Sequence, residues 1–129
     1  MKPGDSIELR VTPDPYLTVR YAGASGDFNP IHIDEEFARQ VGLPGRILHG
    51  LWSMAQVARA VTEAAGGPEK LESLSVQFRG MGRLGEEIVV SGLVSDPDGP
   101  ENGIVSAKLE AVQGDQRIIR NAVARIRPG

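Results

Sequence analysis

The stretch from His49 to about Ala65 limits the possible folds of this chain more than any other segment. It has the composition of a helix whose apolar residues surround most of its circumference. A helix that is apolar nearly all round is buried rather than laid on a surface. The sequence Gly66-Gly67-Pro68 ends this helix. The rest of the chain must therefore supply a layer that covers it. The apolar members are Leu51, Trp52, Met54, Ala55, Val57, Ala58, Ala60, Val61 and Ala64.

The segments on either side have the two-residue period of strands. Leu74, Val76 and Phe78 alternate with serine and glutamine, which indicates a half-buried strand. Short links between strands favour antiparallel pairing. We therefore predict an α+β hotdog fold, in which a curved antiparallel sheet wraps one long central helix, as a single domain over residues 1–129. The other strands are predicted over Ser6 to Thr12, Glu86 to Val94, Ile104 to Val112 and Arg117 to Arg127, with turns at 80–82, 96–100 and 113–115.

The region before the central helix is predicted to hold two short helices and a loop. The first helix covers Tyr16 to Ala24. Ser25 to Ile33 is dense in glycine, aspartate, asparagine and proline, which is typical of a loop. Asp34 suits the N-cap of a second short helix that reaches about Val41.

Composition excludes several classes of function. The formal net charge is −3 and the chain has no basic block, which disfavours nucleic-acid binding. The absence of cysteine excludes disulfides and thiolate metal sites, and no metal site is predicted. No signal core or membrane-spanning run is visible, so we expect a soluble cytoplasmic protein with no membrane partner. Free sheet edges favour a homodimer.

The loop before the second short helix carries groups that are suited to acid–base chemistry. The chain has only two histidines, and Asp27 lies five residues before His32. Gly26 and Pro30 bend the backbone between them. A carboxylate and an imidazole that share a pocket can bind one water and move its protons, which typically contributes about 10²–10⁴-fold in rate. The residues alone leave an alternative equally open, in which Asp27 forms a local turn and His32 satisfies backbone carbonyls.

A longer motif surrounds this pair. The stretch Tyr-Ala-Gly-Ala-Ser-Gly-Asp-Phe-Asn-Pro-Ile-His-Ile-Asp-Glu-Glu-Phe-Ala, residues 21–38, resembles the hydratase motif of the MaoC-like, or (R)-specific enoyl-CoA hydratase, family. The downstream Leu-His-Gly-Leu at 48–51 resembles the His-Gly-Met element of that family. The resemblance implies that Asp27 and His32 are the catalytic pair and that the N–H of Gly50 binds the thioester carbonyl. A helix N-terminus has unpaired N–H groups, which fits that role.

The reaction that the resemblance implies is the reversible addition of water to a trans-2-enoyl thioester, giving an (R)-3-hydroxyacyl thioester. Asp27 is assigned as the base that activates water and His32 as the group that orients it, although these roles could be exchanged. No cofactor is expected, since coenzyme A or an acyl carrier would be part of the substrate. Asn29 is expected to support the loop. Bacterial members acting on short chains have a serine at the position of Ala58, so Ser53 or Gln56 on the same helix is the expected substitute.

Five further residues are candidates for substrate binding. Phe37 and Met54 could line an acyl channel, and His49 could contact substrate, although core packing is the commoner role for such residues. Arg79 and Arg83 could bind the phosphates of a coenzyme A or carrier arm, because arginine binds phosphate through two hydrogen bonds. Solvated surface charge is the alternative for each arginine.

Other functions remain open. Hotdog folds also host thioester hydrolysis. Many such thioesterases have a carboxylate on the central helix, where this chain has only Glu63 near the far end. The chain could also be the catalytic half of a heterodimeric dehydratase with a related hotdog subunit, or a hotdog that binds ligand without turnover.

Overall fold

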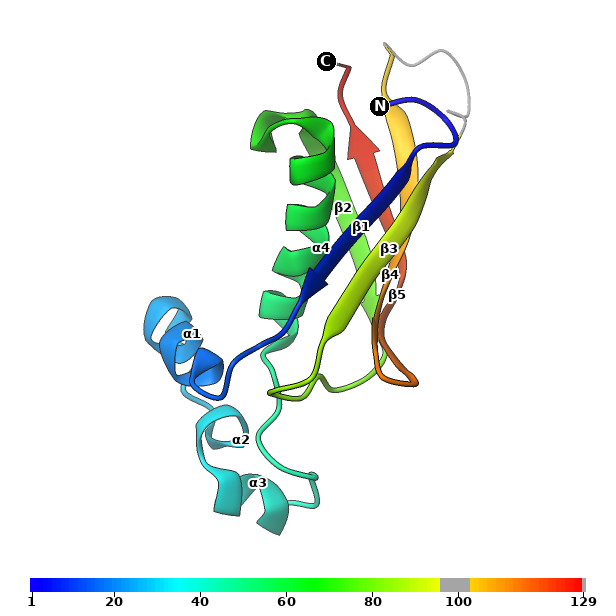
Figure 1. Ribbon diagram of the computed structural model, residues 1–129. Helices are drawn as coiled ribbons and strands as arrows, with labels where there is room; N and C mark the ends of the chain where they lie inside the picture. Colours follow the sequence, from blue (N-terminus) through cyan, green and yellow to red (C-terminus); the bar gives the residue numbers. More distant parts are fainter. Residues whose placement is uncertain (96–102, 129) are drawn as a thin grey trace.

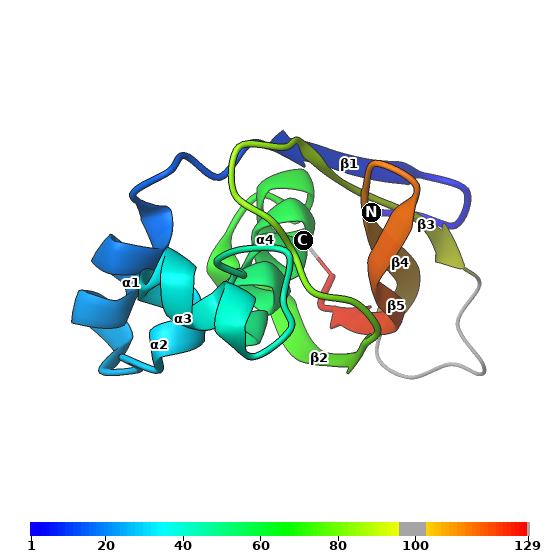
Figure 2. The same ribbon diagram turned by 90° about the horizontal axis from the view of Figure 1, so that it is seen from below.

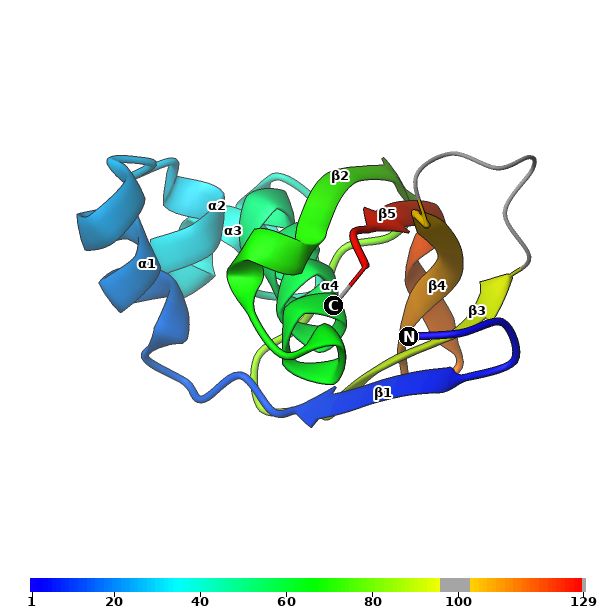
Figure 3. The same ribbon diagram turned by 90° about the horizontal axis from the view of Figure 1, so that it is seen from above.

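One long helix and one curved sheet dominate the architecture. A computed structural model describes residues 1–95 and 103–128. Helix α4 (Gly50–Ala65) lies against a five-stranded antiparallel sheet with strand order β1-β3-β4-β5-β2. The sheet curves round the helix from β1 on one side to β2 on the other (Figures 1, 2 and 3). This arrangement confirms the predicted α+β hotdog fold. The strands are β1 (Ser6–Val11), β2 (Leu71–Phe78), β3 (Ile88–Ser95), β4 (Val105–Gln113) and β5 (Gln116–Ile126).

The core lies between the concave face of the sheet and one side of α4. Val57 and Val61 of α4 are completely buried, as are Val90 of β3 and Ile119 of β5. Strand β4 alternates buried and more exposed residues along its length, as expected for a strand with one face on the core. The turn predicted at 113–115 joins β4 to β5, whereas the turn predicted at 96–100 falls outside the described residues.

The prediction that α4 is buried all round is wrong for the single chain. Leu51 is 66% exposed, and Ala55 one turn later is exposed as well. The single sheet covers only one side of the helix, and that side includes the polar residues Ser53 and Gln56. The chain therefore leaves apolar residues in the N-terminal half of α4 open to its surroundings, whereas the same side of the C-terminal half carries the exposed ion pair of Arg59 and Glu63.

Three short helices lie beneath the N-terminal end of α4 (Figure 1): α1 (Leu17–Ser25), α2 (Pro30–Ile33) and α3 (Glu35–Gln40). The prediction of a continuous loop over Ser25 to Ile33 is wrong, because α2 makes one helical turn there. Proline at the first position of a helix is pre-set for helical backbone angles. The side chain of Asn29 accepts a hydrogen bond from the N–H of Ile31 at 3.2 Å and so caps that turn.

Two connections complete the described chain. A single 3₁₀ turn, η1 (Pro68–Lys70), joins α4 to β2. The segment between β2 and β3 passes under the N-terminal end of α4 and pairs there through one bridge between Ile47 and Arg83. Among the helices that the structure describes, none is long and apolar enough to cross a bilayer.

Candidate active site

A hollow of about 300 Å³ lies at the N-terminal end of α4. Helix α1, the loop before α2, the first turn of α4 and the last residue of β2 all contribute to its wall. The site thus collects residues that are far apart in the sequence, around a helix end whose backbone N–H groups are unpaired. Its lining residues are Tyr21, Ser25, Asp27, His49, Gly50, Leu51 and Phe78.

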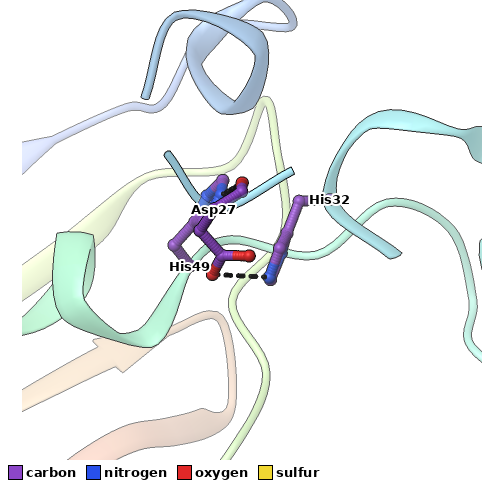
Figure 4. Close-up of side chains that lie close together, drawn as sticks. All are labelled: Asp27, His32 and His49. Carbon is purple, nitrogen blue, oxygen red and sulfur yellow. Dashed lines mark hydrogen bonds and ion pairs between the residues drawn. The ribbon is translucent and has the colours of Figure 1, made fainter. Parts of the chain in front are cut away.

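Asp27 presents its carboxylate to this hollow. The side chain is 53% exposed, and its Oδ2 lies 3.8 Å from Nε2 of His32 (Figure 4). The other oxygen, Oδ1, accepts a hydrogen bond from the N–H of Asn29 at 3.2 Å. The N–H of Asp27 donates to the hydroxyl of Ser25 at 3.2 Å. Local turns therefore fix the backbone on both sides of the carboxylate.

His32 is buried at 7% exposure, with one ring nitrogen bonded to the main chain. Nδ1 lies 2.9 Å from the carbonyl oxygen of Ile47. A carbonyl oxygen only accepts hydrogen bonds, so Nδ1 carries the proton in this contact. Nε2 is therefore the nitrogen with the free lone pair in the neutral ring, and it faces Asp27. The short helix α2 produces this arrangement, since it turns the chain back between Asp27 and His32.

His49 lies directly behind the pair. It is the residue before α4, and its extended backbone at φ −67° and ψ 132° ends the preceding loop. Nε2 lies 3.0 Å from the backbone carbonyl oxygen of Asp27 (Figure 4). The ring stacks on that of His32, with centroids 3.8 Å apart and planes 21° apart. Contacts within the protein thus cover most of the ring surface of His49, and a substrate contact of this residue stays a prediction.

Gly50 is the first residue of α4, so its N–H has no partner within the helix. A Cβ placed on Gly50 would lie 3.3 Å from the ring of Phe78, which is tighter than ordinary contact. Glycine therefore keeps the helix end accessible beside Phe78. An acceptor atom in the hollow, such as a carbonyl oxygen, is in a position to be bound by this helix end.

Ion pairs fix the short helices around the site. The Arg20 guanidinium beside Asp14 holds the pKa of that carboxyl below its usual range, and this pair spans the start of α1. The hydrogen bond from Arg46 lowers the pKa of Glu35, and Arg39 acts in the same direction. Glu35 thereby joins α3 to the strand-like segment that leads into α4.

The supporting residues predicted from sequence fall in two groups. Asn29 does support the loop, as the cap of α2. Ser53 is buried in the first turn of α4 but does not line the hollow. Met54 packs partly buried against the core, and Phe37 lies on α3 at 36% exposure. Neither Met54 nor Phe37 lines the hollow of the single chain.

The structure places Arg79 and Arg83 in different hollows. Arg79 follows β2 and lines a second hollow, of about 490 Å³, with Arg117 and Arg120. Arg83 instead belongs to a third hollow beside Glu35 and forms an ion pair with Glu86 at 3.0 Å. The backbone of Arg83 is fixed by the buried Gln113 side chain, which bonds to both its N–H and its carbonyl oxygen at 2.7 Å.

Sequence reasoning missed several lining residues. Phe78 ends the alternating series of β2 on the side that faces α4, a signal that would have placed it beside the helix N-terminus. Tyr21 begins the motif stretch, and its ring lies 4.7 Å from that of His49. Leu51 follows Gly50 directly, so its place at the helix end was also open to inference.

The side chains of Asp27, His32 and His49 do not have the geometry of a metal site. Asp27, His32 and His49 could each offer one ligand atom within 4.8 Å of the others. The two imidazole rings, however, are stacked and nearly parallel. Their lone pairs lie in their own ring planes and do not converge, whereas zinc requires ligands that converge tetrahedrally. The arrangement fits proton transfer better than coordination.

Comparison with known proteins identifies a family that matches most of the chain. A family model described as "MaoC like domain" matches residues 1–114. The fatty acid synthase subunit beta of Aspergillus oryzae is 45% identical over 73 residues, which are 54% of this chain and 4% of that protein. The peroxisomal enoyl-CoA hydratase 2 of Arabidopsis thaliana is 37% identical over 73 residues, which are 55% of this chain and 23% of that protein.

A solved structure agrees with the architecture. The (R)-hydratase from A. caviae involved in PHA biosynthesis has a TM-score of 0.88 and 18% identity, and the match covers 100% of this chain and 98% of that one. At that identity the likeness shows the hotdog fold alone. This chain spans only a small part of the two curated relatives, 4% and 23% of their lengths. The match over residues 1–114 nevertheless shows that the chain belongs to the MaoC-like dehydratase domain family.

Proposed function

We propose that the chain catalyses the (R)-specific hydration of trans-2-enoyl thioesters to (R)-3-hydroxyacyl thioesters, and the reverse dehydration. The observation that carries this proposal is the 3.8 Å gap between Oδ2 of Asp27 and Nε2 of His32, beside the free N-terminus of α4. A gap of this length between two acceptors is suited to a bridging water.

The proposed chemistry follows from the hydrogen-bonding capacity of that water. Its two protons point to Asp27 and to His32, so a lone pair of its oxygen is free to attack the β-carbon of the substrate. Asp27 takes one proton as the new C–O bond forms. The displaced electron pair moves through the α-carbon onto the thioester oxygen, where the N–H of Gly50 donates a hydrogen bond. A proton then returns to the α-carbon from the Asp27–His32 pair, so water has been added across the double bond.

The oxyanion at Gly50 is the charge that most needs stabilisation. One preorganised donor aimed at such an oxygen is typically worth about 3–4 kcal/mol. The partial positive charge at the N-terminus of α4 adds to it. The close approach of Phe78 to Gly50 encloses this position on one side, which reduces competition from solvent.

We assign the carrier of the acyl group to coenzyme A or a carrier-protein arm, both of which bear phosphate. Arg79 supports this assignment, because it follows Phe78 of the hollow directly and shares a second hollow with Arg117 and Arg120. Arg83 gives less support, since its guanidinium already pairs with Glu86.

Thioester hydrolysis receives no comparable support. The carboxylate that α4 offers, Glu63, lies in the last turn of the helix and pairs with Arg59 at 2.8 Å. That ion pair is exposed and does not line the hollow. Hydrolysis would release free coenzyme A, which provides a direct way to tell the two reactions apart.

We propose that a second copy of the chain covers the open side of α4. Leu51 and Ala55 make the N-terminal half of that side apolar and exposed, and exposed apolar patches commonly mark interfaces. Strands β1 and β2 also form the two edges of the five-stranded sheet. Light scattering of the purified chain should give the mass of a dimer. A monomer that dimerises only with a related hotdog subunit would support the heterodimer instead.

The activity is tested with trans-2-enoyl-CoA substrates of increasing acyl length, because hydration of the conjugated double bond removes its ultraviolet absorbance. We expect a loss of absorbance without release of free thiol, and a product of the (R) configuration by chiral analysis. Release of thiol in step with the absorbance change would favour the thioesterase. No turnover of any chain length, in the hydration or dehydration direction, would contradict the proposal.

A further inference from the structure

The two nitrogens of the buried His49 ring are in different environments. Nε2 lies 3.0 Å from the backbone carbonyl oxygen of Asp27. Nδ1 is buried and has no hydrogen-bond partner among the described residues. The carbonyl can only accept, so Nε2 carries the proton. A second proton on Nδ1 would be buried without an acceptor, which is unfavourable. His49 therefore donates one hydrogen bond, from Nε2, to the main chain of Asp27.

The faces of the same ring are also occupied. One contact is the stack on His32, at 3.8 Å between centroids, and the other is the tilted contact with Tyr21 at 4.7 Å. Only 3% of His49 is exposed, so it contributes little surface to the hollow that it lines. The His32 ring makes one hydrogen bond, from Nδ1 to the carbonyl oxygen of Ile47, and a single hydrogen bond alone would allow the ring to tilt. The stack against His49 restricts that tilt.

We infer that His49 is a positioning residue for the hydration, which holds Asp27 through its backbone and His32 through its ring. This inference rests on the proposed function above. Two further hydrogen bonds of Asp27 are local, since they join it to Ser25 and Asn29, each two residues away. The bond from His49 crosses 22 positions of the chain and ties the turn to α4. The residue after His49 is Gly50, so a single ring couples the acid–base pair to the helix end that receives the carbonyl.

Two substitutions separate the hydrogen bond from the ring. His49→Phe keeps an aromatic ring for the stack but removes the donor to Asp27. His49→Gln keeps an amide donor at about the distance of Nε2 but removes the ring. A misplacement of about 1 Å at a reacting group costs about 10²-fold in rate. We expect kcat of His49→Phe to fall by about that factor while KM stays within about threefold, and His49→Gln to recover part of the loss.

A matched control is Val61→Ala, which creates a cavity at a fully buried position of the same helix, away from the site. It should lower thermal stability and leave kcat unchanged, so that loss of packing alone is distinguished from loss of positioning. Wild-type kcat in His49→Phe would overturn the inference. So would a rise in KM at constant kcat, because that pattern indicates direct binding of substrate.

A measurement that needs no activity tests the same inference. The chain has only two histidines, and the ring of His49 lies 4.7 Å from that of Tyr21, so the imidazole ¹⁵N resonances are assigned in the wild type from the contacts between these two rings. We expect His49 to be protonated on Nε2 and His32 on Nδ1. Protonation of His49 on Nδ1 would overturn the inference, even if the variants fail to fold. An inactive wild type with the expected tautomers would contradict the proposed function and leave the arrangement of His49 supported.

Discussion

Replacement of Asp27 by asparagine removes the proposed base and little else. The amide oxygen of asparagine can still accept the hydrogen bond from the N–H of Asn29, which is 3.2 Å long in the structure. The side chain is 53% exposed, so the change leaves no buried group unpaired. Stability should therefore change by less than about 0.5 kcal/mol, as for surface substitutions in general. The rate should fall by about 10²–10⁴-fold, the usual contribution of a positioned acid or base. That loss corresponds to about 3–5 kcal/mol of activation free energy.

The assay is the ultraviolet absorbance of an enoyl-CoA substrate, with kcat and KM determined for the wild type and the Asp27→Asn variant. Asp34→Asn is the matched control, because it makes the same chemical change in an exposed N-cap of α3. Asparagine caps helices about as well as aspartate, so that variant should keep its rate and its stability. An Asp27→Asn enzyme with wild-type kcat would refute the assignment of Asp27 as the base. An equal loss of kcat in both variants would indicate a change in the conformation of the loop instead.

Four further changes test other parts of the structure. Gly50→Ala places a Cβ 3.3 Å from the ring of Phe78, which is overpacking that typically costs about 1–3 kcal/mol. We expect kcat/KM to fall roughly tenfold, while circular dichroism shows that the fold is retained. Gln113→Ala removes three hydrogen bonds from a side chain that is 1% exposed, so chemical denaturation should register a loss of roughly 3 kcal/mol. Arg79→Gln should raise KM for an enoyl-CoA but leave KM for the matching enoyl-pantetheine, which has no nucleotide phosphates, unchanged; equal effects on both would contradict phosphate binding. The folded-state pKa of Glu35 is lowered chiefly by the hydrogen bond from Arg46, so its contribution to stability is present above the unfolded pKa of about 4.3 and is lost as pH falls through the lower folded value. The difference in melting temperature between wild type and Glu35→Gln should therefore be largest near neutral pH and should disappear in acid.

The architecture was accessible from sequence because its main elements have strong periods. Alternation along Leu74, Val76 and Phe78 identified β2, and the apolar run of α4 identified the central helix. The same run led to an error, since the pattern counts apolar residues without saying which partner covers them. Leu51 and Ala55 are apolar in the sequence and exposed in the single chain. A partner chain that covers these two residues leaves no trace in the hydrophobic periodicity of this sequence.

The candidate site was accessible only in part. The motif indicated Asp27, His32 and Gly50, but the distance between Asp27 and His32 depends on the single turn of α2. Asparagine and proline occur both in loops and at the starts of helices, so composition did not separate these two cases. The orientation of His49 depends on packing between three elements, and no local pattern encodes it. Arg79 and Arg83 are near in sequence, yet they line different hollows. The glycine-rich turn at 80–82 lies between them, and Gln113 fixes the backbone of Arg83 by hydrogen bonds.

Both imidazoles of the site are oriented by carbonyl oxygens of the backbone, His32 by Ile47 and His49 by Asp27. Every residue type carries such an oxygen, so the tautomers of these rings do not depend on which side chain occupies position 47 or 27. Substitutions in the loop should therefore be tolerated by the two rings more readily than a change in its length. A single residue inserted between Gly26 and Pro30 would displace the Asp27 carbonyl from His49 while leaving every side chain of the proposed acid–base pair present. Which nitrogen of each imidazole carries the proton thus depends on the length and path of the backbone. We expect this arrangement to persist when loop side chains are substituted and to be lost when one residue is inserted.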